Sequence, residues 1–203
     1  MADEEAVTAT PPDSPISVTG TDHVTMIGSN AEDTIEYYRD LLGMPLVLRQ
    51  PNLDDPNSTH LFFDTGDGRI ITFFVTDDRP TDSRPLQHQI GSVHHLSFSI
   101  APEAFVDTRE ALEAAGYGYN EFDRGIFHSL YTRDPNGLTI ELSTDKYDIP
   151  DDRRGEVLAT AQRIREDDGA DYAKDEHLAA ALEELGLDAE PYDLPDAPTG
   201  AGH

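Results

Sequence analysis

Apolar and polar residues alternate in eight short segments of the chain, and this two-residue period predicts β-strands. Two longer stretches, about 30–42 and 102–115, instead place apolar residues at helical spacing. Asn30 is the expected N-cap of the first helix, and Gly43 and Gly116 end the two helices. The pattern therefore predicts the order β-α-β-β-β twice. The predicted strands are 23–27, 46–49, 60–64 and 69–75 in the first half, and 94–100, 117–122, 127–132 and 138–143 in the second half.

The two halves of the chain also resemble copies of one unit. The segment DHVTM at 22–26 aligns with HHLSF at 94–98, and GRIIT at 68–72 aligns with GLTIE at 137–141. The spacing between the copies barely drifts over this length, which indicates a tandem repeat of one supersecondary unit. The repeat places His23 and His95 at equivalent positions of the first strands. It likewise places Thr72 and Glu141 at equivalent positions of the last strands.

These patterns predict an α+β fold in which two tandem βαβββ modules form a curved, cup-like mixed sheet, followed by C-terminal helices. The first residues are acidic and contain prolines without periodicity, which is typical of a flexible arm. After the second module the pattern changes to two amphipathic helices, about 153–166 and 175–186. The predicted parts are an acidic arm at 1–17, a two-module domain at 18–147 with modules at about 19–76 and 92–144, and a helical extension with a flexible tail at 148–203.

The chain is strongly acidic, because 41 Asp and Glu residues outnumber 14 Lys and Arg residues and give a net charge of −27. A surface of this sign repels phosphate, so nucleic acid is not an expected partner. The alternating apolar segments argue against disorder as the reason for the acidity. We therefore predict a halophilic protein with a carboxylate-covered surface, adapted to a salt-rich cytoplasm in which ions screen the self-repulsion.

The sequence contains no cysteine, which excludes disulfides and thiolate nucleophiles. No apolar run reaches the length of a membrane span. The N-terminus MADEE is acidic, whereas a signal peptide is basic and then apolar. We expect a soluble, cytoplasmic protein that has no membrane partner.

Three potential metal ligands share the polar side of the predicted strands. Alternation places His23, His95 and Glu141 opposite the clearest apolar residues of their strands. Two imidazoles and one carboxylate are the ligand set of an open non-haem Fe(II) site. Thr72 matches Glu141 in the repeat and is a poor ligand, so the predicted site has three ligands and open positions for substrate and dioxygen or water. The other histidines divide into weaker pocket candidates, His60 and His128, and structural or surface residues, His88, His177 and His203.

The paired β-α-β-β-β units, with ligands on their first and last strands, resemble the vicinal oxygen chelate superfamily. This superfamily includes glyoxalases, fosfomycin-resistance proteins, bleomycin-binding proteins and extradiol ring-cleaving dioxygenases. Four segments are similar to the ring-cleaving dioxygenases that open hydroquinones, and the resemblance covers about residues 19–147. These segments are LDDPNSTHLFF at 53–63, IITFF at 70–74, HHLSF at 94–98, and 124–137, which ends in DPNG.

The resemblance implies a non-haem Fe(II) or Mn(II) dioxygenase of the extradiol type, with a hydroquinone or catechol and dioxygen as substrates. It implies that His23, His95 and Glu141 are the metal ligands. It also implies that His94, Arg124 and Tyr131 surround the substrate and oxygen as catalytic groups. Tyr131 and Glu141 flank a predicted hairpin turn, so the phenol is expected to reach the carboxylate. Strict alternation places His94 on the apolar side, so it faces the pocket only where the strand becomes irregular.

Two other functional classes are compatible with the same residues. A glyoxalase or a fosfomycin-type transferase shares the fold, although a glyoxalase usually has a fourth side-chain ligand where this chain has Thr72. A non-enzymatic protein that sequesters aromatic compounds would use the same cup without a metal. The hydroquinone-opening relatives commonly have four units, whereas this chain has two. We therefore expect that a second subunit of a homodimer or larger homo-oligomer, or the C-terminal helices, complete the site.

Overall fold

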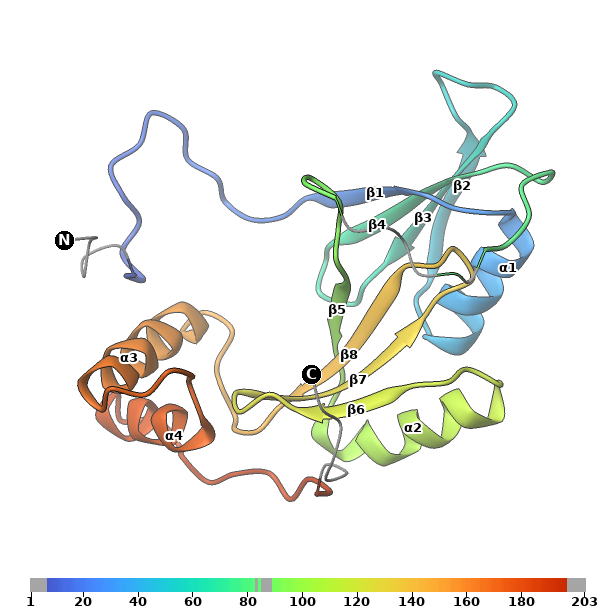
Figure 1. Ribbon diagram of the computed structural model, residues 1–203. Helices are drawn as coiled ribbons and strands as arrows, with labels where there is room; N and C mark the ends of the chain where they lie inside the picture. The colour runs from blue at the N-terminus through green and yellow to red at the C-terminus, as the bar shows by residue number, and fades with distance from the viewer. Residues whose placement is uncertain (1–6, 83, 85–88, 197–203) are drawn as a thin grey trace.

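Two four-stranded mixed sheets form the body of the protein in the computed structural model (Figure 1). The structure describes residues 7–82, 84 and 89–196, so His88 and His203 lie outside the described residues. The first sheet has the order β1-β4-β3-β2, and the second has the order β5-β8-β7-β6. The strands are β1 (His23–Ile27), β2 (Leu46–Pro51), β3 (Thr59–Asp64), β4 (Ile70–Val75), β5 (Leu96–Ser99), β6 (Asn120–Asp123), β7 (Phe127–Arg133) and β8 (Thr139–Asp145).

The two sheets repeat the same topology and register. In each sheet the first strand pairs in parallel with the last, while the remaining neighbours are antiparallel. Thr25 of β1 lies opposite Thr72 of β4, and in the same way Ser97 of β5 lies opposite Glu141 of β8. The predictions of an α+β fold and of two βαβββ modules are therefore confirmed.

A shared apolar core joins the two modules. It contains Tyr37, Tyr38 and Phe73 from the first module, together with Leu112 and Ile140 from the second, all buried. These residues come from the helices and from one face of each sheet. The opposite face of β1 and β5 carries exposed residues, because alternate side chains of a strand point to opposite sides of the sheet.

The helix of the first module differs from the single α-helix that its spacing predicts. Helix α1 (Ala31–Ile35) begins after Asn30, whose side chain accepts a hydrogen bond from the backbone N–H of Asp33, so the predicted N-cap is present. The chain then continues as the π-helix η1 (Glu36–Leu41). This segment buries two successive tyrosines, Tyr37 and Tyr38, and the Tyr38 hydroxyl donates to Asp134 of the second module at 2.9 Å. The wider turn lets both rings enter the core.

The second module carries a short 3₁₀ turn η2 (Pro102–Ala104) followed by helix α2 (Phe105–Ala114). The largest boundary differences are at the strand starts: β5 begins at Leu96 rather than at 94, and β6 begins at Asn120 rather than at 117. Tyr117 instead closes the C-terminus of α2, because its N–H donates to the carbonyl of Leu112. Its ring packs against that of Tyr37.

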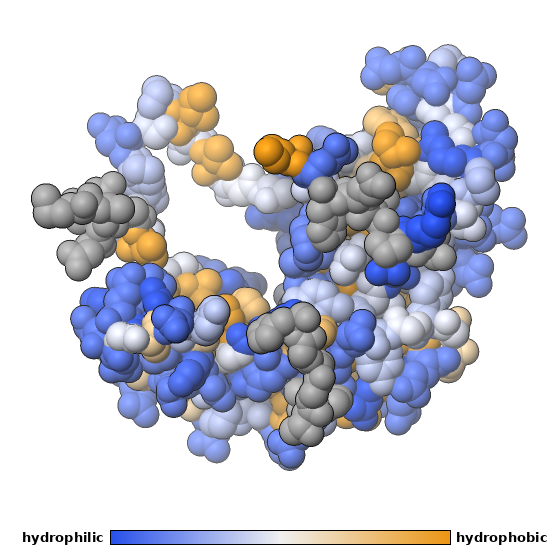
Figure 2. Space-filling view, viewed as in Figure 1, coloured by the Kyte–Doolittle hydropathy of each residue, from blue (hydrophilic) through white to orange (hydrophobic). Residues whose placement is uncertain are grey.

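The C-terminal extension contains the two predicted helices, α3 (Arg154–Asp167) and α4 (Asp175–Glu184). They enclose a second apolar cluster and lie beside the ends of β6, β7 and β8 (Figure 1). The visible face is mostly hydrophilic and is hollowed between these helices and the sheets (Figure 2). None of the helices in the described part of the chain combines the length and apolarity that a bilayer crossing requires. The buried members of the cluster are Tyr147, Ile149, Val157, Ala161, Leu178, Ala181 and Leu182.

Candidate functional site

Glu141 is the centre of a polar cluster on the second sheet. Its position on β8 places it between Ser97 of β5 and Tyr131 of β7. The Glu141 side chain is only 7% exposed, yet both carboxylate oxygens have partners. Oε2 lies 3.0 Å from Nε2 of His95, and Oε1 accepts a hydrogen bond from the Tyr131 hydroxyl at 2.5 Å. The structure therefore brings together three of the six predicted site residues around one buried carboxylate.

Tyr131 lies in an aromatic environment that holds its phenol in place. Its ring centroid is 5.6 Å from that of Phe122 and 5.8 Å from that of His95, with edge-to-face geometry in both pairs. Burial, and then the hydrogen bond to Glu141, raise the pKa of the Tyr131 phenol. The phenol consequently stays protonated at neutral pH and serves as a hydrogen-bond donor.

Arg124 extends over the same aromatic pair from the turn between β6 and β7. Its guanidinium carbon is 4.4 Å from the Phe122 ring centroid and 5.4 Å from the Tyr131 ring centroid. Both distances are within the range of cation–π attraction. The turn is closed by a hydrogen bond from the Arg124 N–H to the carbonyl of Phe127 at 2.8 Å. Arg124 thus adds a positive charge beside the phenol of Tyr131.

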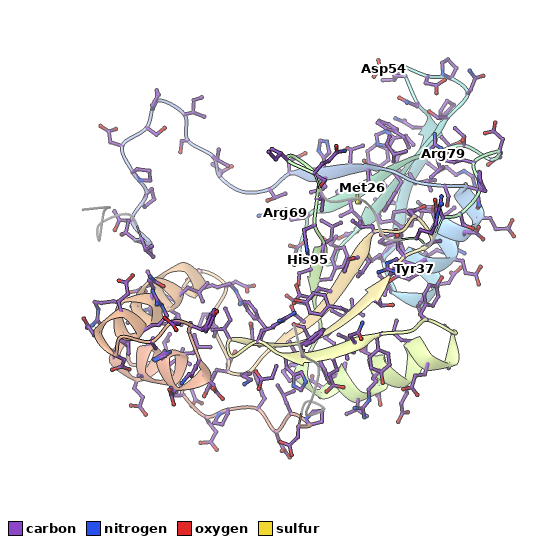
Figure 3. All side chains as sticks on the ribbon, in the orientation of Figure 1. Met26, Tyr37, Asp54, Arg69, Arg79 and His95 are labelled. Carbon is purple, nitrogen blue, oxygen red and sulfur yellow. The ribbon has the colours of Figure 1, made fainter. Side chains whose placement is uncertain are left out.

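His94 contacts the cluster through His95. The two Nδ1 atoms are 2.8 Å apart, so one ring donates the hydrogen and the other accepts it. Both residues precede the first residue of β5, so strand alternation does not separate them. Figure 3 places His95 beside β5, between the sheets and the C-terminal helices in this view. The structure therefore brings His94 to the edge of the site.

His23 lies on the other sheet, and its side chain is 54% exposed. Its Nδ1 is 2.5 Å from a carboxylate oxygen of Asp22. The ring of His60 is nearby, packed against Phe62 and Phe74; burial and then the charge of His23 lower the pKa of His60. Within residues 7–82, 84 and 89–196, no three His, Cys, Asp or Glu side chains are close enough to hold a metal ion.

The predicted ligands are therefore divided within one chain into the pair His95 and Glu141 and the separate His23. The repeat makes His23 and His95 equivalent, but equivalence does not make them neighbours. Each lies on its own sheet, and the modules pack through their helical sides. A metal ion brought into the site by this chain alone would have two of the three ligands.

The pair itself has a geometry suited to an octahedral ion. Two ligand atoms in adjacent octahedral positions, each about 2.1 Å from the ion, are about 3.0 Å apart. The 3.0 Å separation of His95 Nε2 and Glu141 Oε2 equals that spacing. Imidazole and carboxylate are also donors that suit Fe(II) and Mn(II). These two residues are suited to hold adjacent positions on such an ion.

The remaining histidines lie away from this cluster. His128 is buried on the helical side of the second sheet, where Nε2 is 2.9 Å from Glu121 and the ring packs on Phe105. His177 is buried and accepts the backbone N–H of Lys174 at the start of α4, which is the structural role expected of it. Neither residue contributes to the site.

Sequence reasoning did not identify the polar and aromatic residues that surround the predicted groups. Phe122 supports Arg124, and the Ser97 and Ser143 hydroxyls lie 3.2 Å apart near Glu141. Ser129 is fully buried, and its hydroxyl has no hydrogen-bond partner among the residues that the structure describes. Strand alternation places Ser97 on the face of His95, Ser129 on that of Tyr131 and Ser143 on that of Glu141, because residues two positions apart share a face.

The family model described as Glyoxalase/Bleomycin resistance protein/Dioxygenase superfamily matches residues 20–142. MhqO of Bacillus subtilis, whose name assigns it provisionally to the ring-cleaving dioxygenases, is 30% identical over 126 residues, which are 61% of this chain and 39% of that protein. The chlorohydroquinone/hydroquinone 1,2-dioxygenase of Sphingobium indicum is 28% identical over 102 residues, or 47% of this chain and 30% of that protein.

The chain thus spans less than half of the length of these curated relatives. Among solved structures, a glyoxylase/bleomycin resistance protein/dioxygenase domain from Frankia sp. EAN1pec superposes with a TM-score of 0.55 at 20% identity. The match covers 66% of this chain and 96% of that one, and it shows the fold.

Proposed function

The chain belongs to the Glyoxalase/Bleomycin resistance protein/Dioxygenase superfamily, and from this membership we propose that it is a metal-dependent, extradiol-type ring-cleaving dioxygenase acting on a hydroquinone or catechol. The observation that supports this proposal is the cluster of His95, Tyr131, Arg124 and His94 around the buried carboxylate of Glu141. The names of the relatives, which include a chlorohydroquinone/hydroquinone dioxygenase, favour a phenolic substrate.

His95 and Glu141 would hold Fe(II), or alternatively Mn(II), through the two atoms that lie 3.0 Å apart. When bound, the ion supplies a meeting point for the phenol and dioxygen and a path for electron density between them. The hydrogen bond from Tyr131 to Oε1 orients the carboxylate, so that Oε2 faces His95. A carboxylate fixed in this way does not need to reorganise when substrate binds.

Arg124 would control charge at the substrate, and His94 would orient a ligand beside it. The guanidinium of Arg124 lies over the Tyr131 ring, where its positive charge favours a bound phenolate over the neutral phenol. When His95 holds the ion through Nε2, its Nδ1–H would donate to Nδ1 of the exposed His94, which lies 2.8 Å away. His94 would therefore fix the tautomer and orientation of the ligand His95 beside the substrate.

We further propose that a second copy of the chain supplies the third ligand, His23. The exposed His23 side chain and the two-ligand pair on the other sheet support this arrangement. A two-fold dimer forms both sites at once, because each chain gives His23 to its partner and receives the partner's His23.

Oxygen uptake tests the proposed activity directly. Protein purified without oxygen, loaded with Fe(II) in high salt and offered hydroquinone or catechol should consume dioxygen only when both metal and phenol are present. His95→Ala and Glu141→Ala should lose metal and activity together, whereas Glu110→Ala, an exposed acidic residue on α2, should retain both. Bound metal without uptake would favour an isomerase or transferase of this fold, and absence of metal binding would favour sequestration of aromatic compounds.

Complementation tests the shared site. His23→Ala and Glu141→Ala chains, each inactive alone, are unfolded together and refolded as a mixture. Each mixed dimer then keeps one site with an intact ligand set, so activity should return. Failure of the mixture to recover activity, with dimers present, would remove the proposal that His23 comes from the partner.

A further inference from the structure

We infer that the C-terminal extension is a positioning element for the site: it fixes the turn 123–127, and thereby holds Arg124 over Tyr131. The extension, residues 148–203, follows the family match, which ends at residue 142. The inference rests on the proposed function for the role of Arg124. The contacts that support it are three, and each reaches a different residue of this turn.

The first contact is an ion-pair bridge through Lys146, which directly follows β8. Its Nζ lies 2.7 Å from Asp123 and 3.3 Å from Asp175, the first residue of α4. The Lys146 side chain is only 13% exposed, so this bridge is partly withdrawn from solvent. Asp123 also accepts the N–H of Gly125 at 2.8 Å. The bridge therefore links the start of α4 to the residue immediately before Arg124.

The second contact is a close approach of two backbone segments at Gly125, immediately after Arg124. A Cβ placed on Gly125 would lie 2.7 Å from the carbonyl oxygen of Ala173. Gly125 also has a φ of +81°, a conformation that favours glycine. The loop before α4 therefore lies directly against the turn, and only a glycine permits this distance.

The third contact is apolar. Ile126 packs against the buried cluster of the extension, which includes Val157 and Leu178. Arg124 is thus flanked by residues that are attached to the extension on both sides, while its own side chain extends over Phe122 and Tyr131. An exposed turn without such contacts is mobile, and an arginine on it would sample many positions.

Lys146 also links the extension to the metal-binding strand. It follows Asp145, the last residue of β8, and Glu141 lies four residues earlier on that strand. Arg154 at the start of α3 forms a two-point ion pair with Asp145, at 3.0 and 2.6 Å. The extension is therefore fixed to the strand that carries Glu141 and to the turn that carries Arg124, which sets the distance between them.

A double-mutant cycle distinguishes positioning from general stabilisation. We expect Arg124→Gln to lower kcat/KM about a hundredfold and Lys146→Met about tenfold, with the double variant no worse than Arg124→Gln alone. Lys146→Arg should restore most of the loss. Lys174→Met removes the same charge from an exposed side chain whose ion pair is with Glu176, and kcat/KM should stay within about twofold of wild type. Additive losses in the double variant would overturn the inference.

Tryptic cleavage after Arg124 tests the same contact without any catalytic readout. The folded protein should resist this cut, and Lys146→Met and Gly125→Ala should each accelerate it about tenfold or more, as followed by the mass of the fragment that begins at residue 125. Lys174→Met should leave it unchanged. Equal cleavage in all variants would overturn the inference, whatever the activity. Accelerated cleavage of these variants, in a protein that shows no oxygen uptake, would support the contact between the extension and the turn and would reject the proposed function.

Discussion

Removing the phenolic oxygen of Tyr131 measures how strongly the hydrogen bond to Glu141 stabilises the site. The hydroxyl lies 2.5 Å from Oε1 of a carboxylate that is 7% exposed. In Tyr131→Phe the ring keeps its contacts with Phe122 and His95. The change removes the hydrogen bond to Glu141 together with the polar contact of the phenol oxygen with Arg124, and it removes little packing.

The expected loss follows from the burial of the acceptor. A hydrogen bond to a charged group contributes about 1.5–3 kcal/mol, and a buried oxygen that loses its donor is not freely rehydrated. His95 still contacts the other oxygen, so the charge keeps one partner. We expect the free energy of unfolding to fall by about 2 kcal/mol, which corresponds to a decrease in Tm of about 4–8 °C for a chain of this size.

The matched control is Tyr119→Phe. The Tyr119 hydroxyl donates to Glu113 at 2.7 Å, which is the same chemical pair on the exposed surface. Water replaces the lost donor there, so the expected change in the free energy of unfolding is below about 0.5 kcal/mol. Urea unfolding in molar KCl compares the two variants. Equal losses would refute the argument that burial of Glu141 gives the Tyr131 bond its strength.

The same variant separates metal binding from turnover. Tyr131→Phe keeps both His95 Nε2 and Glu141 Oε2, so metal content measured by elemental analysis should stay at the wild-type level. Turnover should fall about tenfold or more, because the carboxylate loses the donor that orients it. Unchanged oxygen uptake would remove Tyr131 from the proposed catalytic groups.

Further predictions concern the whole fold. The net charge of −27 should make the urea midpoint rise from dilute to molar KCl, and a midpoint independent of salt would contradict the proposed halophilic adaptation. Burial raises the pKa of Tyr37 and of Tyr38 above the value in the unfolded chain. The stability that the protonated phenols confer is therefore present below about pH 10 and is lost as the pH rises further. Tyr38→Phe should accordingly reduce the alkaline decline in the free energy of unfolding. At Gly137 φ is +82°, and a Cβ would collide with the carbonyl oxygen of Arg84 and lie 2.7 Å from that of Asp82. Gly137→Ala should therefore lower the free energy of unfolding by about 2 kcal/mol or more, against about 1 kcal/mol for the unobstructed Gly66→Ala, both measured by urea unfolding.

Local patterns in the sequence predicted most of the fold. Alternation identified the eight strands that the described residues form, and the repeat identified the common topology of the two modules, because the periods of strands and helices depend on neighbouring residues. The errors are at element boundaries and in η1, where burial of Tyr37 and Tyr38 widens the helix. The two tyrosines contact the second module, and the spacing of apolar residues within 30–42 carries no information about that contact.

The same contrast applies to the site. Sequence alone determined that His95, Glu141 and Tyr131 share one sheet face, because strand parity and a tight turn define the register of neighbouring strands. It also determined that His23 is equivalent to His95 in the repeat. Only the tertiary structure decided that these two histidines lie on separate sheets, and that the extension reaches Arg124 through Lys146. Distances between modules depend on which faces pack together, and that is set by the summed burial of the shared core rather than by any single segment.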